Sequence, residues 1–149
     1  MSEYEVVSFE SVTLAVTESF TKQSEIPSRI RGMFDVVYAW LRESGNDQTG
    51  HNYAIYDQFS DHGMRMRVGF PVAEQFPDTS EVQCLELQGG RAAHLTHRGP
   101  YSRLGTAHSQ LYEWCVQNSL KMSGESWEVY GDWTDDESRL ETDIYIRLD

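Results

Sequence analysis

The sequence predicts an α+β fold, in which two strand-helix-strand-strand units form one curved antiparallel sheet. Apolar residues recur at helical spacing in one long segment of each half of the chain. In the segments that follow, apolar and polar residues alternate, which is typical of strands with one buried face. We expect the two helices to cover one face of the sheet and to leave a ligand cleft on the other.

The two helices are expected at about residues 27–43 and 100–118. Pro27 stands at the start of the first segment and Gly45 follows its end, as is typical of helix termini. The second segment begins at Pro100. Its apolar face comprises Leu104, Ala107, Leu111, Trp114 and Cys115.

Matching residues in the two halves indicate an internal duplication. At one constant offset, Trp40, Gly50 and Tyr56 correspond to Trp114, Gly124 and Tyr130. Strands are expected at residues 13–16 and 92–95 before the helices, and at 52–58, 64–72, 127–133 and 142–148 after them. The chain is therefore interpreted as one domain, residues 1–149, with internal repeats at about 1–75 and 76–149.

Composition and charge argue against several classes of protein. Twelve basic and 24 acidic residues give a formal charge of −12, the wrong sign for direct binding of nucleic acid. No apolar segment has the length of a membrane span, and the two unpaired-looking cysteines suit the cytoplasm. His94 and His97 fall on opposite faces of a strand, so no metal or cofactor is expected.

The stretch from Ser126 to Tyr130 contains the strongest candidate for a functional residue. Strand alternation places Glu128 and Tyr130 on one side and Trp127 and Val129 on the other. If Val129 faces the helices, Glu128 faces the cleft. A carboxylate beside aromatic rings could attract an organic cation or exchange a proton. The alternative is an exposed glutamate on an edge strand. Three polar residues of the second helix, Ser102, His108 and Ser109, are expected to cap it or to face solvent.

Three motifs resemble a known family. They are His97-Arg98-Gly99-Pro100-Tyr101, Trp127-Glu128-Val129-Tyr130 and Thr142-Asp143-Ile144-Tyr145-Ile146. The chain resembles the gyrase-inhibitory-protein-like (GyrI-like) family, also called the AraC-type effector-binding domain, over nearly its whole length. This family includes ligand-sensing domains of multidrug-responsive regulators, an inhibitor of DNA gyrase and cyclopropane-opening hydrolases. The resemblance implies that Glu128 meets cationic drugs in a pocket lined by aromatic residues.

These observations predict a stand-alone cytoplasmic protein that binds a small apolar or cationic organic molecule, because residues 1–26 show no helix-turn-helix segment. Glu128 is the expected anchor, and the expected walls are Tyr56, Tyr101, Tyr130 and Tyr145. One alternative is a hydrolase of electrophilic, cyclopropanoid compounds that uses Glu128 as general acid or base. Another is an interaction module for gyrase or for a separate transcription regulator. Binding without turnover is favoured.

Overall fold

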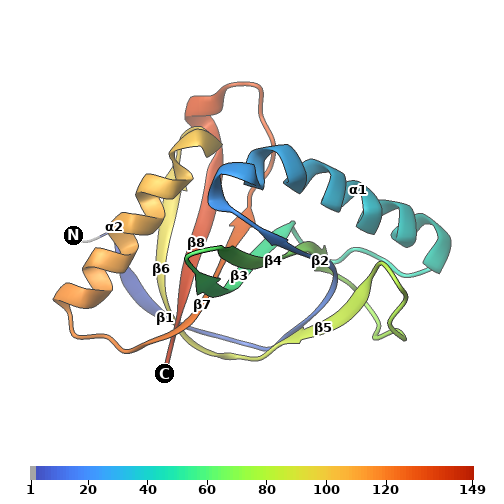
Figure 1. Ribbon diagram of the computed structural model, residues 1–149, viewed down its shortest axis with the longest axis horizontal. Coiled ribbons are helices and arrows are strands. Elements are labelled where there is room, and N and C mark those ends of the chain that lie inside the picture. Colours follow the sequence, from blue (N-terminus) through green and yellow to red (C-terminus); the bar gives the residue numbers. More distant parts are fainter. Residues whose placement is uncertain (1–2) are drawn as a thin grey trace.

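An eight-stranded antiparallel sheet that curls into a half-barrel forms the body of the protein (Figure 1). The computed structural model describes residues 3–149. The strands are β1 (Glu5–Phe9), β2 (Val12–Thr21), β3 (Tyr53–Ser60), β4 (Gly63–Pro71), β5 (Gln83–Leu87), β6 (Gly90–Arg98), β7 (Met122–Tyr130) and β8 (Glu141–Leu148). Their order in the sheet is β1-β6-β8-β7-β3-β4-β2-β5, and every neighbouring pair is antiparallel.

Two helices, α1 (Ile26–Ser44) and α2 (Leu104–Gln117), lie on one face of this sheet and diverge from each other above it (Figure 1). Pro27 stands in the first turn of α1, and Gly45 ends the helix with a φ of 73°, a left-handed conformation that glycine adopts without strain. Residues 101–103, expected to be part of α2, form a 3-10 turn before it. The predicted fold class, a curved antiparallel sheet with two helices on one face, is confirmed.

Equivalent strands of the two halves lie at equal distances from the centre of the sheet. β3 and β7 pair at the centre, followed by β4 and β8, then β2 and β6, and finally β5 and β1. The outermost strands are exchanged between the two halves. β5 belongs to the second half of the chain but pairs with β2 of the first, and β1 belongs to the first half but pairs with β6 of the second. The junction of the two units therefore runs between β3 and β7, beneath both helices.

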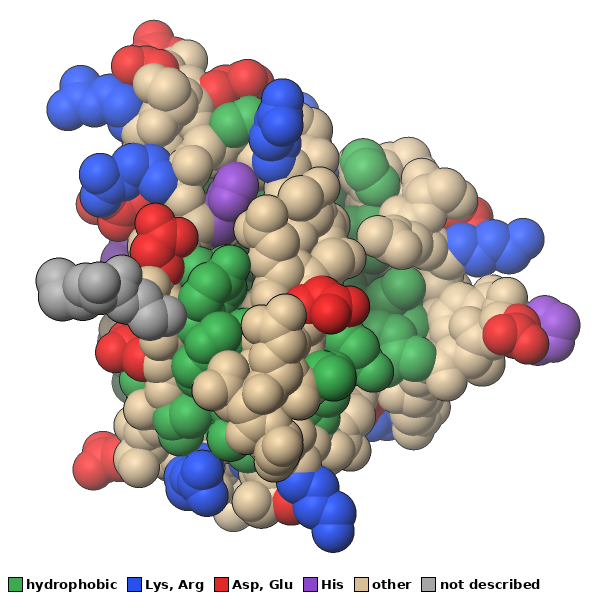
Figure 2. Space-filling model, turned by 90° about the vertical axis from the view of Figure 1, so that its left-hand side faces the viewer, with side chains coloured by type: hydrophobic (Ala, Val, Ile, Leu, Met, Phe, Trp, Pro, Cys, Tyr) green, Lys and Arg blue, Asp and Glu red, His purple; other side chains and the backbone are tan. Residues whose placement is uncertain are grey.

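Both faces of the sheet have an apolar core. On the helix side, Leu111 of α2 packs with Ile144 of β8, and Val37 of α1 packs with Phe70 of β4. On the concave side, Trp127 packs with buried residues of β2 and β3. Apolar side chains also reach the surface on the α2 side (Figure 2). The two cysteines, Cys84 and Cys115, are free thiols.

Candidate functional site

Glu128 lies at the centre of the sheet, on the face that the helices cover. Its neighbours in the sheet are Ala54 of β3 and Ile144 of β8, and only 4% of its surface is exposed. Ile144 packs against α2, so Glu128 points toward the helices. The expectation that Val129 faces the helices and that Glu128 faces an opposite, open cleft is therefore wrong. Each face of the sheet is covered by an apolar core, and alternation alone does not say which face a helix covers.

Three side chains from three elements bond to the Glu128 carboxylate. The hydroxyls of Tyr130 and Tyr56 donate to Oε1 at 2.6 and 3.2 Å. His108 of α2 places Nε2 2.8 Å from Oε2. Hydrogen bonds to an ionised acceptor are shorter and stronger than neutral ones, so this cluster holds the carboxylate in one orientation.

Burial raises the pKa of Tyr56 and Tyr130 well above the usual value for tyrosine, and the charge of Glu128 raises both further. A second negative charge beside the carboxylate would be unfavourable. Both phenols therefore stay protonated and act as hydrogen-bond donors over the whole neutral range.

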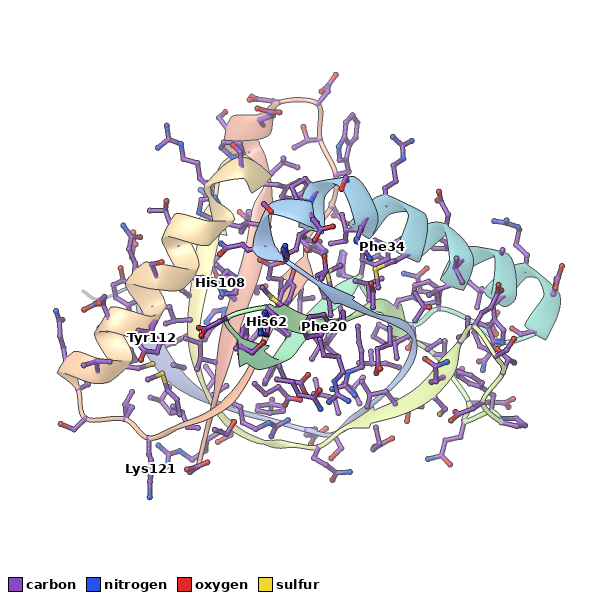
Figure 3. All side chains as sticks on the ribbon, viewed as in Figure 1. Phe20, Phe34, His62, His108, Tyr112 and Lys121 are labelled. Carbon is purple, nitrogen blue, oxygen red and sulfur yellow. The ribbon has the colours of Figure 1, made fainter. Side chains whose placement is uncertain are left out.

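Aromatic rings surround this polar cluster on the helix side. Tyr101, in the turn before α2, and Phe34 of α1 meet the Tyr130 ring edge to face, with centroids 5.6 and 6.3 Å away. The ring of Tyr56 meets that of His108 in the same way at 6.3 Å. Figure 3 shows His108 beside α2 and Phe34 beside α1. The site therefore combines a buried carboxylate with ring faces and edges, an arrangement suited to a flat or cationic organic group.

The structure brings together four of the five residues expected from the sequence: Glu128, Tyr130, Tyr56 and Tyr101. Tyr145 lies on the other face of the sheet. It stacks on Trp127 at 5.3 Å, and burial raises its pKa to about 12.

His108 was missed as a site residue, because it was expected to cap the helix or to face solvent. It follows Leu104 by four residues and precedes Leu111 by three, and both leucines are buried. The helical spacing that identifies the apolar face of α2 thus includes His108 and could have placed it inward.

Other parts of the described chain offer fewer candidates. Residues 3–149 contain no group of three or more His, Cys, Asp or Glu side chains arranged to hold a metal ion. Neither helix of this range has the length and apolarity needed to cross a bilayer. Two cavities, of about 420 and 230 Å³, lie between α1 and β2 and do not touch Glu128.

Comparison with known proteins gives a family and a set of structural neighbours. The model of the GyrI-like small molecule binding domain matches residues 2–149. No curated protein sequence is significantly similar to the chain.

Three solved structures share the fold at low sequence identity. The C-terminal domain of EcmrR is 15% identical with a TM-score of 0.87, over 98% of this chain and 96% of that one. SAV2435 bound to tetraphenylphosphonium is 13% identical with a TM-score of 0.73, over 99% and 94%. A hydrolase encoded by lin2189 from Listeria innocua is 8% identical with a TM-score of 0.63, over 98% and 91%.

Proposed function

Since the chain belongs to the GyrI-like small molecule binding domain family, we propose that it binds a hydrophobic organic cation and that Glu128 is the anchor. The observation that carries this proposal is the buried carboxylate between the two helices, with aromatic rings around it and no lysine or arginine bridged to it among residues 3–149. A buried charge is costly unless an opposite charge or several hydrogen bonds compensate it. An organic cation would supply that charge.

The surroundings of Glu128 favour a large, weakly hydrated cation over a small one such as ammonium. Tyr56, Tyr130 and His108 already donate hydrogen bonds to the carboxylate. A ligand that offers charge without a strong donor group can therefore share the site with the phenols. The rings of Tyr101 and Phe34 would contact its apolar surface and contribute cation–π attraction. The fold relative SAV2435 with tetraphenylphosphonium supports this class of ligand.

A ligand can reach Glu128 only by displacing side chains of the helix layer. The His108 side chain is 24% exposed and Tyr101 is 41% exposed, so both stand between the carboxylate and solvent. Both belong to α2 or to the turn that precedes it. We expect α2 and this turn to adjust when the ligand enters, while the sheet stays in place.

A second function, hydrolysis, has one observation in its favour. Two phenols and an imidazole lie within hydrogen-bond distance of the Glu128 carboxylate, as the supporting groups of a general acid or base must. The shared fold with a hydrolase from Listeria innocua is consistent with it. In this reading Glu128 would activate a water molecule for attack on an electrophilic, strained substrate. Turnover that is lost in Glu128→Gln would support it, and stoichiometric binding without product would exclude it for that compound.

The binding proposal is tested by titration calorimetry with tetraphenylphosphonium and with neutral triphenylphosphine oxide as a matched ligand. A carboxylate about 6 Å from a unit positive charge contributes about 2–3 kcal/mol at an effective dielectric constant of about 20. Glu128→Gln should therefore weaken the cation by about thirtyfold or more and leave the neutral ligand nearly unchanged. Glu113→Gln, the same change at an exposed position of α2, is the control. Equal cation affinity in all three proteins would refute the role of Glu128.

A further inference from the structure

One end of β2 forms an open edge of the sheet. β4 pairs with β2 as far as Thr21, whereas β5 on the other side pairs with it only over Val12–Val16. Among the described residues, Thr17–Thr21 therefore has no neighbouring strand on that side. An unpaired edge of this kind is a template for another extended segment.

The backbone groups of Glu18 and Phe20 point outward from this edge. The carbonyl of Thr13 accepts a bond from Val72 on the β4 side, and in an antiparallel strand the direction alternates with each residue. The backbone N–H and C=O groups of the odd-numbered residues of β2 thus point toward β4. Those of Glu18 and Phe20 point away from it. Within residues 3–149, the one hydrogen bond to these outward groups is a long bond from the Ser19 hydroxyl to the Phe20 carbonyl, at 3.5 Å.

A groove runs along this edge, between β2 and α1. It consists of the two adjoining cavities of about 420 and 230 Å³, which share Thr17 and Val36. The α1 side of the groove also includes Gly32 and Met33. A Cβ atom at Gly32 would meet no atom within 4 Å, so this glycine leaves room beside the strand.

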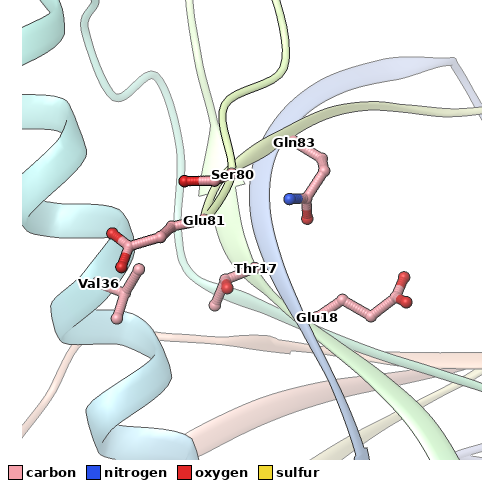
Figure 4. Close-up of a pocket in the computed structure, with 6 residues that line it drawn as sticks. All are labelled: Thr17, Glu18, Val36, Ser80, Glu81 and Gln83. Carbon is pink, nitrogen blue, oxygen red and sulfur yellow. The ribbon is translucent and has the colours of Figure 1, made fainter.

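Two acidic side chains lie along the groove, and its one basic side chain among the described lining residues, Arg29, is paired with Glu25 at 3.3 Å. Figure 4 shows Glu81 with its side chain directed toward Val36, and Glu18 on the neighbouring strand. Glu81 has no ion pair among the described residues, and half of the Glu18 side chain is exposed despite a 3.7 Å pair with Arg65. The whole chain carries a formal charge of −12.

We infer that this groove binds an extended segment of a basic partner protein, which adds a strand beside Thr17–Thr21. Strand addition in a groove between a sheet edge and a helix is a recurrent mode of peptide recognition, with affinity from backbone bonds and specificity from alternate side chains. One set of side chains would face Gly32, Met33 and Val36 and should be apolar. The other set would lie beside Glu18 and should be basic. A second copy fits poorly, because two chains of charge −12 repel each other.

The test is fluorescence anisotropy of the full chain with labelled acetyl-Lys-Val-Lys-Val-Lys-Val-amide. Gly32→Leu fills the groove without a clash and should weaken binding by at least about tenfold. Phe20→Pro removes an outward N–H without breaking a bond to β4 and should weaken binding similarly. Gly105→Leu on α2 is the matched control and should bind as the wild type does. Circular dichroism and melting temperature confirm that each variant is folded.

A second peptide separates strand pairing from simple charge attraction. The same sequence with N-methyl groups on alternate residues keeps its charge and cannot pair along one edge. Loss of binding on methylation supports the inference. Equal binding of both peptides, or unchanged affinity in Gly32→Leu and Phe20→Pro, would overturn it. Self-association of the wild type that Phe20→Pro abolishes, with no peptide binding, would overturn it in favour of a second copy.

Discussion

Replacing Tyr130 with phenylalanine should destabilise the protein, because it removes the shortest bond to the buried carboxylate. The Tyr130 hydroxyl lies 2.6 Å from Glu128 Oε1. Hydrogen bonds to charged groups contribute about 1.5–3 kcal/mol. The ring and its contacts with Phe34 and Tyr101 are retained, so no cavity term is added. We expect the free energy of unfolding to fall by about 2 kcal/mol, which corresponds to a decrease of about 4–8 °C in Tm for a chain of this size.

Urea unfolding measures this change, with an unaltered dependence on urea concentration as the sign that only stability has changed. Tyr112→Phe is the control, since that ring is 53% exposed on α2. In a Glu128→Gln background, where the acceptor is neutral, the same removal should destabilise by only about 1 kcal/mol. The reasoning is refuted if Tyr130→Phe lies within about 0.5 kcal/mol of the wild type, or if the two backgrounds give equal losses.

Three further predictions follow from other contacts. The bond to Asp143 raises the pKa of His94 above 6.5 and lowers the pKa of Asp143. Protonated His94 therefore stabilises the fold fully below about pH 6.5, and this stabilisation is lost as pH rises through the raised pKa of His94. The Asp143 contribution is lost only in acid, as pH falls through its lowered pKa. Calorimetry should therefore show a Tm difference between wild type and His94→Gln that is largest near about pH 5–6, and a constant difference would contradict this. Gly69→Ala should lower the free energy of unfolding, measured by urea unfolding, by more than about 3 kcal/mol, because a Cβ would lie 1.7 Å from the Ala15 carbonyl oxygen. A variant as stable as the wild type would disprove this close approach. His108→Ala should raise affinity for tetraphenylphosphonium by about tenfold or more in calorimetric titration. The change frees a carboxylate oxygen and removes a bond to a charged group, of about 1.5–3 kcal/mol, which a ligand would otherwise have to displace; weaker binding would instead assign His108 to ligand contact.

Periodicity in the sequence was sufficient to predict the helices and most inner strands. The first helix was expected at residues 27–43 and spans Ile26–Ser44. The strand expected at residues 127–133 instead spans Met122–Tyr130. A register shift between Met122 and Ser126 breaks the alternation at its start. At its end, the contact with β8 stops at the bond from the Gly131 amide to the carbonyl of Glu141, the first residue of β8. Local irregularities of this kind have no period that a sequence pattern could reveal.

The sequence predicted the central residue of the candidate site and three of its aromatic neighbours, but not His108 or the face of the sheet on which they lie. Alternation paired Glu128 with Tyr130 correctly, because side chains two residues apart share a face. It could not say that α2 covers this face, since helix placement depends on contacts between distant segments. The same limit explains Tyr145, which has the residue type of a pocket wall but packs on the concave side against Trp127.

The exchanged outer strands bear on how such a chain could arise and how it should unfold. A polypeptide consisting of one half, with an additional strand before its strand-helix-strand-strand unit, could complete its sheet only by donating that additional strand to a second copy, as in a domain-swapped dimer. Joining two copies in one gene would preserve that reciprocal donation as β1 pairing with β6 and β5 pairing with β2. Neither half then retains a full sheet without the other, so the 149-residue chain should unfold in one cooperative step although its two halves have the same order of elements. Separate fragments cut between β4 and β5 should regain the native sheet only when mixed.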